Sequence, residues 1–140
     1  MATRKVAVND KLPSVTKRIT QESINDFESC GILDRENIHN SPEIARQRLG
    51  TSFPIASGRM SVTYATEVMR RYFGSQVFNH SGSVNLKFLR PVKAGDTITV
   101  TGEVSESERV AQGVKYTVNL ICQNQNGDQT AVGVGTAVVP

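Results

Sequence analysis

The sequence predicts a single α+β domain in which an antiparallel sheet wraps around one long helix. Helical patterns fill the first half of the chain and strand patterns fill the second half, a segregation typical of α+β layers rather than alternating βαβ units. A length of 140 residues suits one domain, and its 38% hydrophobic and 21% charged residues are ordinary for a globular protein. We place the domain at residues 13–140 and expect residues 1–12 to form a flexible basic tail.

The long central helix is predicted between about Gly58 and Phe73. Ser57 is placed to cap its first turn, and Gly74 follows its last turn. Its apolar and small residues recur at helical spacing, which predicts one buried face, formed by Ser61, Tyr64, Ala65, Val68, Met69 and Tyr72. The small residues near its start would allow a ligand or another backbone to approach closely.

Shorter elements precede this helix. Residues 15–19 predict a short strand, and Thr20 is a plausible cap for a helix that Gly31 can end. Residues 32–40 have no clear period and predict a loop. Ser41, followed by a proline and an acidic residue, predicts the start of another short helix that ends at Gly50.

The second half of the chain alternates polar and apolar residues with the period of a strand. We expect strands near residues 84–88, 97–104 and 114–122, and a fourth after the hairpin signal Asn126-Gly127. We predict that they follow one another as a meander whose apolar face is covered by the long helix. This arrangement is the hot-dog architecture. In the last strand, small residues on one side permit close approach to the helix or to another subunit.

Charge and cysteine content exclude several classes of protein. The net charge is +3, but five of the basic residues lie in positions 1–20 and the rest of the chain is balanced. We therefore expect no nucleic-acid partner, since that needs a basic face. No run of 18 apolar residues and no secretory signal is present, so we expect no membrane span and a cytoplasmic location. The two cysteines, Cys30 and Cys122, lie far apart and suit free thiols.

Two residues in the predicted loop are candidates for acid–base chemistry. Asp34 and His39 lie five residues apart, and a loop can turn both side chains toward one water molecule. On spacing alone, an ordinary surface loop is the more common explanation. His80, the other histidine, has no catalytic partner nearby, and we interpret it as a hydrogen-bonded loop residue.

Gly58 is a candidate for binding a carbonyl oxygen that becomes negatively charged during a reaction. A glycine in the first turn of a helix presents its N–H where the helix dipole adds partial positive charge. A glycine placed there only for packing is the alternative. We group Ser57 with this site and take Ile55, Ser61 and Ala65 as candidates to line a substrate pocket.

Two segments resemble those of a known family. Residues 18–27, followed by Gly31, Asp34, Ile38-His39 and residues 42–45, are similar to the MaoC-like (R)-specific enoyl-CoA hydratase family. Residues 84–92 with Gly95-Asp96-Thr97 are similar to that family's second motif. The resemblance covers about residues 15–138 in the same order.

The resemblance implies a hot-dog fold, a homodimer or higher oligomer, and reversible addition of water to trans-2-enoyl thioesters. It further implies that Asp34 and His39 are catalytic, that the Gly58 N–H holds the thioester carbonyl, and that no metal is needed. No separate cofactor is expected, because coenzyme A or acyl-carrier phosphopantetheine is part of the substrate.

The chain departs from the family pattern at two places. Glu36-Asn37 stands where an Asn-Pro pair is common, and Ser57 stands where a histidine often precedes the glycine. Arg59 is an unfavourable charge at a helix start unless it faces an acidic or phosphate group. The carrier's phosphates have candidate partners, although solvated surface is the more ordinary role for each of them: Arg59, Arg70, Arg71, Lys87 and Arg90.

Two other functions remain open at this point. A hot-dog thioesterase would share the fold and the carrier but would hydrolyse the acyl bond. A non-catalytic acyl-binding or heterodimeric partner subunit would also fit a chain of this length, and Glu36 and Ser57 would then be signs of a relaxed site. Chain length of the acyl group, carrier type and direction of reaction do not follow from the sequence.

Overall fold

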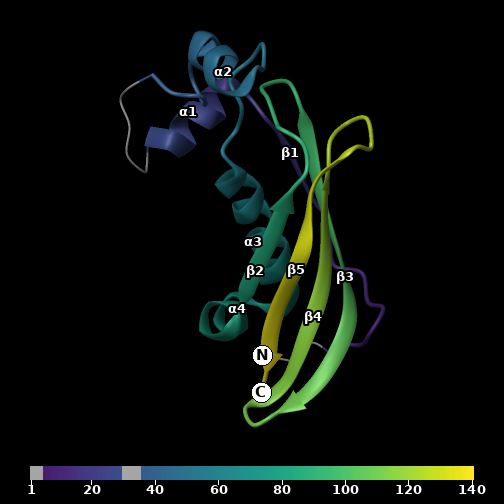
Figure 1. Ribbon diagram of the computed structural model, residues 1–140. Helices are drawn as coiled ribbons and strands as arrows, with labels where there is room; N and C mark the ends of the chain where they lie inside the picture. Colours follow the sequence, from purple (N-terminus) through teal and green to yellow (C-terminus); the bar gives the residue numbers. More distant parts are fainter. Residues whose placement is uncertain (1–4, 30–35) are drawn as a thin grey trace.

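Five strands form one antiparallel sheet, and a long helix lies along one of its faces (Figure 1). The computed structural model describes residues 5–29 and 36–140. The α+β hot-dog fold predicted from the sequence is therefore confirmed. In chain order the elements are β1 Val15–Arg18, α1 Gln21–Ser29, α2 Pro42–Leu49, α3 Gly58–Phe73, α4 Ser75–Ser81, β2 Ser83–Phe88, β3 Thr97–Val110, β4 Gly113–Gln123 and β5 Gln129–Val139.

The order of strands in the sheet is β1-β3-β4-β5-β2, which corrects the predicted meander. Strands β3, β4 and β5 do follow one another, but β2 pairs with β5 and not with β3. The reason lies in residues 89–96, which make no tight hairpin. Their first part is held to β5 by the bond from Leu89 N to Thr130 O, and their last part reaches β1 through Ile19 N and Asp96 O. The connection therefore crosses the whole end of the sheet.

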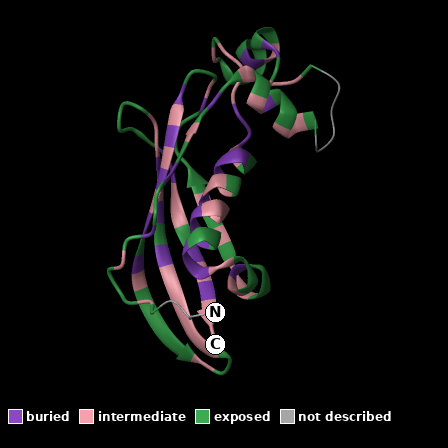
Figure 2. Ribbon diagram, turned by 180° about the vertical axis from the view of Figure 1, so that it is seen from behind, coloured by how far each residue is buried: buried purple, intermediate pink, exposed green. Residues whose placement is uncertain are grey.

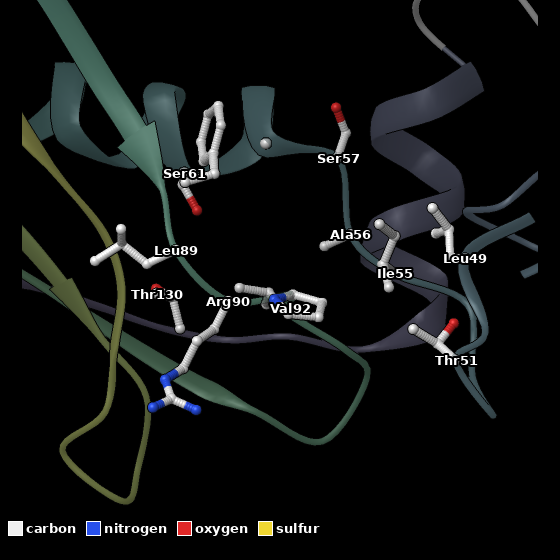
Figure 3. Close-up of a pocket in the computed structure, with 13 residues that line it drawn as sticks. Leu49, Thr51, Ile55, Ala56, Ser57, Ser61, Leu89, Arg90, Val92 and Thr130 are labelled. Atoms are coloured by element: carbon white, nitrogen blue, oxygen red, sulfur yellow. The ribbon is translucent and has the colours of Figure 1, made fainter.

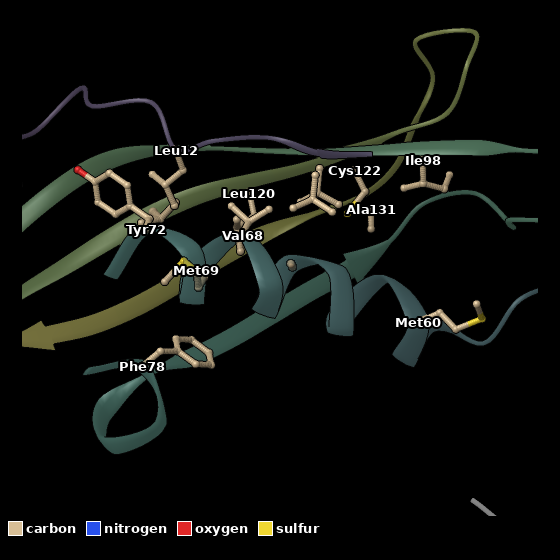
Figure 4. Close-up of a cluster of buried hydrophobic side chains, with 14 of the residues drawn as sticks. Leu12, Met60, Val68, Met69, Tyr72, Phe78, Ile98, Leu120, Cys122 and Ala131 are labelled. Carbon is tan, nitrogen blue, oxygen red and sulfur yellow. The ribbon is translucent and has the colours of Figure 1, made fainter. Parts of the chain in front are cut away.

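Helix α3 buries the face that its sequence pattern predicts. Its contacts reach all five strands, and the buried stripe faces the sheet in Figure 2. The predicted close approach of the last strand is also present, because a Cβ atom at Gly135 would lie 2.7 Å from Met69 Sδ. No helix in the described residues is long and apolar enough to span a membrane. The core around α3 is drawn in Figure 4.

The helix boundaries follow their capping residues. Thr20 Oγ1 accepts a hydrogen bond from Ser23 N at the start of α1, and Ser41 Oγ accepts one from Ile44 N at the start of α2. Gly50 ends α2 in the left-handed conformation with φ 71°. Each of these caps was predicted. Helix α4 was not predicted, and it places His80 in a helix rather than a loop.

The first part of the chain is packed against the sheet, which moves the predicted domain boundary. Leu12 is buried, and its N–H donates to Gly102 O at 2.9 Å. Asp10 O accepts from Val104 N, and Asp10 Oδ2 accepts from the Tyr72 hydroxyl at 2.7 Å. We predicted residues 5–12 to be part of a tail. Their contacts with β3 and α3 begin well before residue 13.

Candidate active site

A cavity of about 470 Å³ opens at the start of α3 (Figure 3). The segment before α3, the end of β2 and the connection 89–92 form its walls. Most of the lining is apolar. Three of the five large hydrophobic side chains that are exposed in the described residues stand around it: Leu49, Phe88 and Leu89. An exposed apolar cluster around a cavity is typical of a binding site for an apolar ligand or partner.

Backbone hydrogen bonds hold the walls together. Ala56 N donates to Val92 O at 2.6 Å, which joins the segment before α3 to the connection after β2. Ile55 N donates to Ile38 O at 3.0 Å, which joins the same segment to the turn that carries His39. The predicted catalytic turn and the predicted carbonyl site are therefore fixed to one short segment.

The side chain of His39 is oriented by the same segment. Its Nδ1 lies 2.8 Å from the carbonyl oxygen of Ile55. A carbonyl oxygen can only accept, so Nδ1 carries the hydrogen and neutral His39 has its lone pair on Nε2. The backbone is held too, because its N–H donates to Asn37 Oδ1 and its carbonyl accepts from Gln21 Nε2 at 2.9 Å. His39 is half-buried and does not itself line the cavity.

The other predicted catalytic residue, Asp34, lies outside the described residues, as do Cys30 and Gly31. Glu36, noted as a departure from the family pattern, is exposed. Asn37, which belongs to the same departure, forms an Asx turn that orders the backbone of His39. It therefore has a structural role in presenting the histidine.

Gly58 is the first residue of α3 and lines the cavity. A Cβ atom at this position would lie 2.7 Å from Cζ of Phe88 and 2.9 Å from its Cε atoms. The tip of the Phe88 ring thus rests where a side chain at 58 would be. Within the described residues no group accepts a hydrogen bond from the Gly58 N–H.

The other predicted pocket residues are only partly brought together. Ile55, Ser57 and Ser61 line the cavity. The Ser57 oxygen accepts from Arg59 N at 3.3 Å as the helix cap, so a further role in substrate binding stays a prediction. Ala65 is fully buried in the core and does not reach the cavity. A role for Ala65 in substrate binding stays a prediction.

The charges proposed to meet carrier phosphates differ in how they are used. Arg59 lies 3.7 Å from Glu28, which supplies the acidic partner that its position at a helix start requires. Arg70 donates twice to Asn79 Oδ1, and Arg71 pairs with Glu67. Arg90 is the member of this set that lines the cavity, whereas Lys87 is exposed on β2.

The part of the chain that the structure describes contains no candidate metal site. No three side chains of His, Cys, Asp or Glu cluster there as a metal site would require. The expectation that the reaction needs no metal stays a prediction. The burial of Cys122 raises the pKa of its thiol to about 11, so this thiol suits the core rather than chemistry.

Sequence reasoning missed several residues of the cavity. Phe88, Leu89 and Thr130 line it but were not among the predicted pocket residues. One signal was available: Leu89 is apolar where the alternation of β2 calls for a polar residue. Such a break in period at a strand end indicates a side chain used for something other than the sheet.

The fold and the cavity at the start of its central helix place the chain in the hot-dog class of proteins. A family model described as MaoC like domain matches residues 5–126, and the chain belongs to this MaoC-like dehydratase family. A comparison with curated proteins by sequence finds no match.

Solved structures share the fold at low identity. The R-hydratase PhaJ1 from Pseudomonas aeruginosa is 23% identical over 96% of this chain and 83% of its own, with a TM-score of 0.75. The (R)-hydratase from A. caviae involved in PHA biosynthesis is 20% identical over 98% and 99%, with a TM-score of 0.76. A chain of the ChsH1-ChsH2 complex from Mycobacterium tuberculosis is 20% identical over 96% and 100%, with a TM-score of 0.74.

Proposed function

We propose that this protein adds water reversibly to trans-2-enoyl thioesters and forms (R)-3-hydroxyacyl thioesters. The MaoC-like family and the R-hydratases of the same fold support hydration or dehydration at the level of the family. The observation that carries the proposal is the bond between His39 Nδ1 and Ile55 O at 2.8 Å. It leaves Nε2 available as a base and holds the ring against Ile55, a residue that lines the cavity.

His39 acts on a water molecule in this mechanism. Nε2 accepts a proton from water as its oxygen attacks C3 of the substrate, and the resulting imidazolium keeps its Nδ1–H bond to Ile55 O. Because that acceptor is a fixed backbone carbonyl, the imidazole ring does not need to turn during the reaction. Asp34 holds the same water beside His39, and the proton that Nε2 has taken is then returned to C2, which restores the neutral imidazole.

Gly58 stabilises the charge that develops on the substrate. As the hydroxyl group adds to C3, negative charge moves onto the thioester oxygen in an enolate-like state. The unpartnered N–H of Gly58, at the positive end of α3, is suited to donate to that oxygen. A substrate bound against the apolar lining would displace water from the cavity, which strengthens this interaction.

The carrier arm of the substrate leaves along the cavity mouth. Arg90 lines this mouth and is suited to meet a phosphate of coenzyme A or of an acyl-carrier phosphopantetheine. No other cofactor enters the proposed reaction. The apolar residues Leu49 and Leu89 at the rim are suited to the acyl part.

We also propose that the protein works as a homodimer or higher oligomer. Strand β2 is an edge of the sheet, and the exposed Phe88 and Leu89 stand at its end. A neighbour of the same fold forms the ChsH1-ChsH2 complex, so a heterodimer is the alternative assembly. Light scattering of the purified chain separates the two, since only a self-assembling chain gives twice the monomer mass when alone.

The test is steady-state hydration of crotonyl-CoA and of longer enoyl-CoA substrates up to twelve carbons. We expect the wild type to form the 3-hydroxyacyl thioester, and Asp34→Asn and His39→Gln each to lower kcat by about 10³-fold. The exposed Glu36→Gln is the matched control in the same loop and should change kcat less than about threefold. Equal rates for the wild type and both variants would contradict the assignment.

The same assay identifies the other functions. Release of free CoA without a hydroxyacyl product would indicate a thioesterase. Binding of acyl-CoA without turnover, with activity only after a second protein is added, would indicate a partner subunit. Chiral analysis of the product separates (R) from (S) addition.

A further inference from the structure

We propose that Ser61 is a second hydrogen-bond donor to the thioester oxygen, beside the N–H of Gly58. This inference rests on the proposed function and adds a residue to its site. It would make the carbonyl site of this protein a pair of donors on one turn of α3, one from the backbone and one from a side chain.

The first observation is a hydroxyl group without a hydrogen-bond partner, on a residue that is otherwise buried and that lines the cavity. Ser61 is 5% exposed, and within the described residues no group forms a hydrogen bond with its Oγ. Its oxygen points from α3 into the cavity, toward the side of Leu89 and Thr130 (Figure 3). A polar ligand atom in that cavity would supply the missing partner.

The second observation is a contrast with other hydroxyl groups in helices. Thr63, two residues later in α3, donates to Arg59 O at 2.9 Å, and Ser81 in α4 donates to Val77 O at 3.0 Å. Both follow the usual bond to the carbonyl one turn back. Ser61 has the same option toward Ser57 O, but within the described residues its hydroxyl makes no such bond. The hydroxyl group points into the cavity instead (Figure 3).

The third observation is the position of Ser61 relative to Gly58. The two are three residues apart, so they lie on one face of α3, and side chains of a helix lean toward its N-terminus. The hydroxyl group of Ser61 thus reaches back over the turn that begins at Gly58. Both groups line the same cavity. One acceptor atom placed there meets two donors.

A thioester oxygen is the substrate atom that fits this pair. It accepts weakly in the ground state and strongly once it carries the charge of the enolate, so donors aimed at it act mainly in the transition state. The surrounding wall is apolar, which favours the acyl thioester over charged ligands of similar size. No bond to Ser61 forms or breaks in this role.

The experiment compares Ser61→Ala with Thr63→Ala, the matched removal of a hydroxyl group that is already bonded within α3. We expect Ser61→Ala to lower kcat for enoyl-CoA hydration by about 100-fold and to change KM less than about threefold. Thr63→Ala should change neither by more than about twofold. Ser61→Thr keeps the hydroxyl group and should recover most of the loss.

A second readout reports the hydrogen bond itself. In infrared difference spectra of bound crotonyl-CoA, the thioester carbonyl band should lie at lower frequency in the wild type and Ser61→Thr than in Ser61→Ala. Equal band positions and equal kcat in the wild type and Ser61→Ala would overturn the inference, provided that thermal unfolding shows both folded. If Asp34→Asn and His39→Gln still abolish activity in that case, the proposed function stands without Ser61. A wild type that hydrates no enoyl-CoA overturns both.

Discussion

The two ends of α3 use the same buried face in opposite ways. Toward its C-terminus, Val68, Met69 and Tyr72 fill the space against the sheet. Gly135 on β5 has no side chain, and Met69 occupies the space that one would take. Toward its N-terminus, Gly58 and Ser61 leave a cavity that only the tip of Phe88 enters. One helical pattern thus gives a packed core at one end and an unfilled site at the other. The difference lies in side-chain volume and not in periodicity.

The largest expected effect is at the packed end. Met69→Ala should lower the free energy of unfolding by about 3 kcal/mol, because the side chain is fully buried and leaves a hole. Phe88→Ala removes a larger side chain, but that residue is 53% exposed, and we expect a loss of about 1 kcal/mol. Guanidinium unfolding of both variants measures the contrast. Equal losses would mean that the cavity end is packed as tightly as the core.

The glycines of the two ends should respond differently to an added methyl group. Gly135→Ala forces a methyl against Met69 and Leu120 in the core and should cost about 2 kcal/mol. Gly58→Ala meets only the ring tip of the half-exposed Phe88, which can move outward, so the cost should be under about 1 kcal/mol. The double variant Gly58→Ala/Phe88→Ala should show a favourable coupling in the unfolding cycle, since the second change removes the contact. Strict additivity would contradict the close packing of Phe88 on Gly58.

Low pH should lower the stability of the fold near the cavity through protonation of Asp96. This buried residue lies in the turn after Val92 and accepts bonds from Lys93 N, Lys93 Nζ and Gln125 Nε2. Burial raises its pKa, but these hydrogen bonds and the Lys93 charge outweigh burial, and the pKa of the folded state lies below its ordinary value. A depressed folded pKa gives stability that is complete above the unfolded pKa of about 3.9 and is lost as the pH falls through the folded pKa.

Asp96→Asn therefore tests that turn. We expect it to lower stability by about 1–2 kcal/mol at pH 7, and the difference from the wild type should shrink below about pH 4. Urea unfolding over this pH range gives the measurement. The exposed Asp128→Asn, in the turn after β4, is the control and should leave the pH profile unchanged. A constant difference at all pH values would rule out titration of Asp96 as the cause.

The smallest expected effect concerns the rate at which the buried Cys122 thiol reacts. Cys122 is buried, and the pKa of about 11 that burial gives it keeps the thiolate scarce at neutral pH. In a Cys30→Ser background we expect a thiol reagent to label Cys122 only as fast as the protein unfolds. Added crotonyl-CoA should slow that labelling if it stabilises the fold. Fast labelling of the native protein would show that the cavity end opens far into the core.

The elements that the sequence predicted best are those set by local chemistry. The caps at Thr20, Ser41 and Ser57 and the alternation of β3 and β4 depend on neighbours in the chain, and each was located correctly. The pairing of β2 with β5 was not, because it joins segments distant in sequence, and an alternating strand carries no mark of its partner.

The candidate site was predictable only in part for the same reason. Gly58 and Ser61 could be placed at the start of a helix face because the pattern of that helix defines the face, and both line the cavity. The bond from His39 to Ile55 and the contact of Phe88 with Gly58 join loops and strand ends, and no periodicity encodes them. Ala65 belongs to the same stripe of small residues but is packed in the core, which the pattern alone does not distinguish.

The position of β2 bears on how the protein is made. Its sheet partner is β5, the strand that the ribosome delivers after β3 and β4. Phe88 and Leu89 form one wall of the cavity, and Leu89 is hydrogen-bonded to Thr130 on β5. During synthesis, this wall cannot be held in place until β5 has emerged. Loop-closure entropy over this long separation must be overcome before the anchor forms. The cavity wall thus forms only after β5 has been synthesised, and a chain that lacks β5 would hold a ligand there poorly.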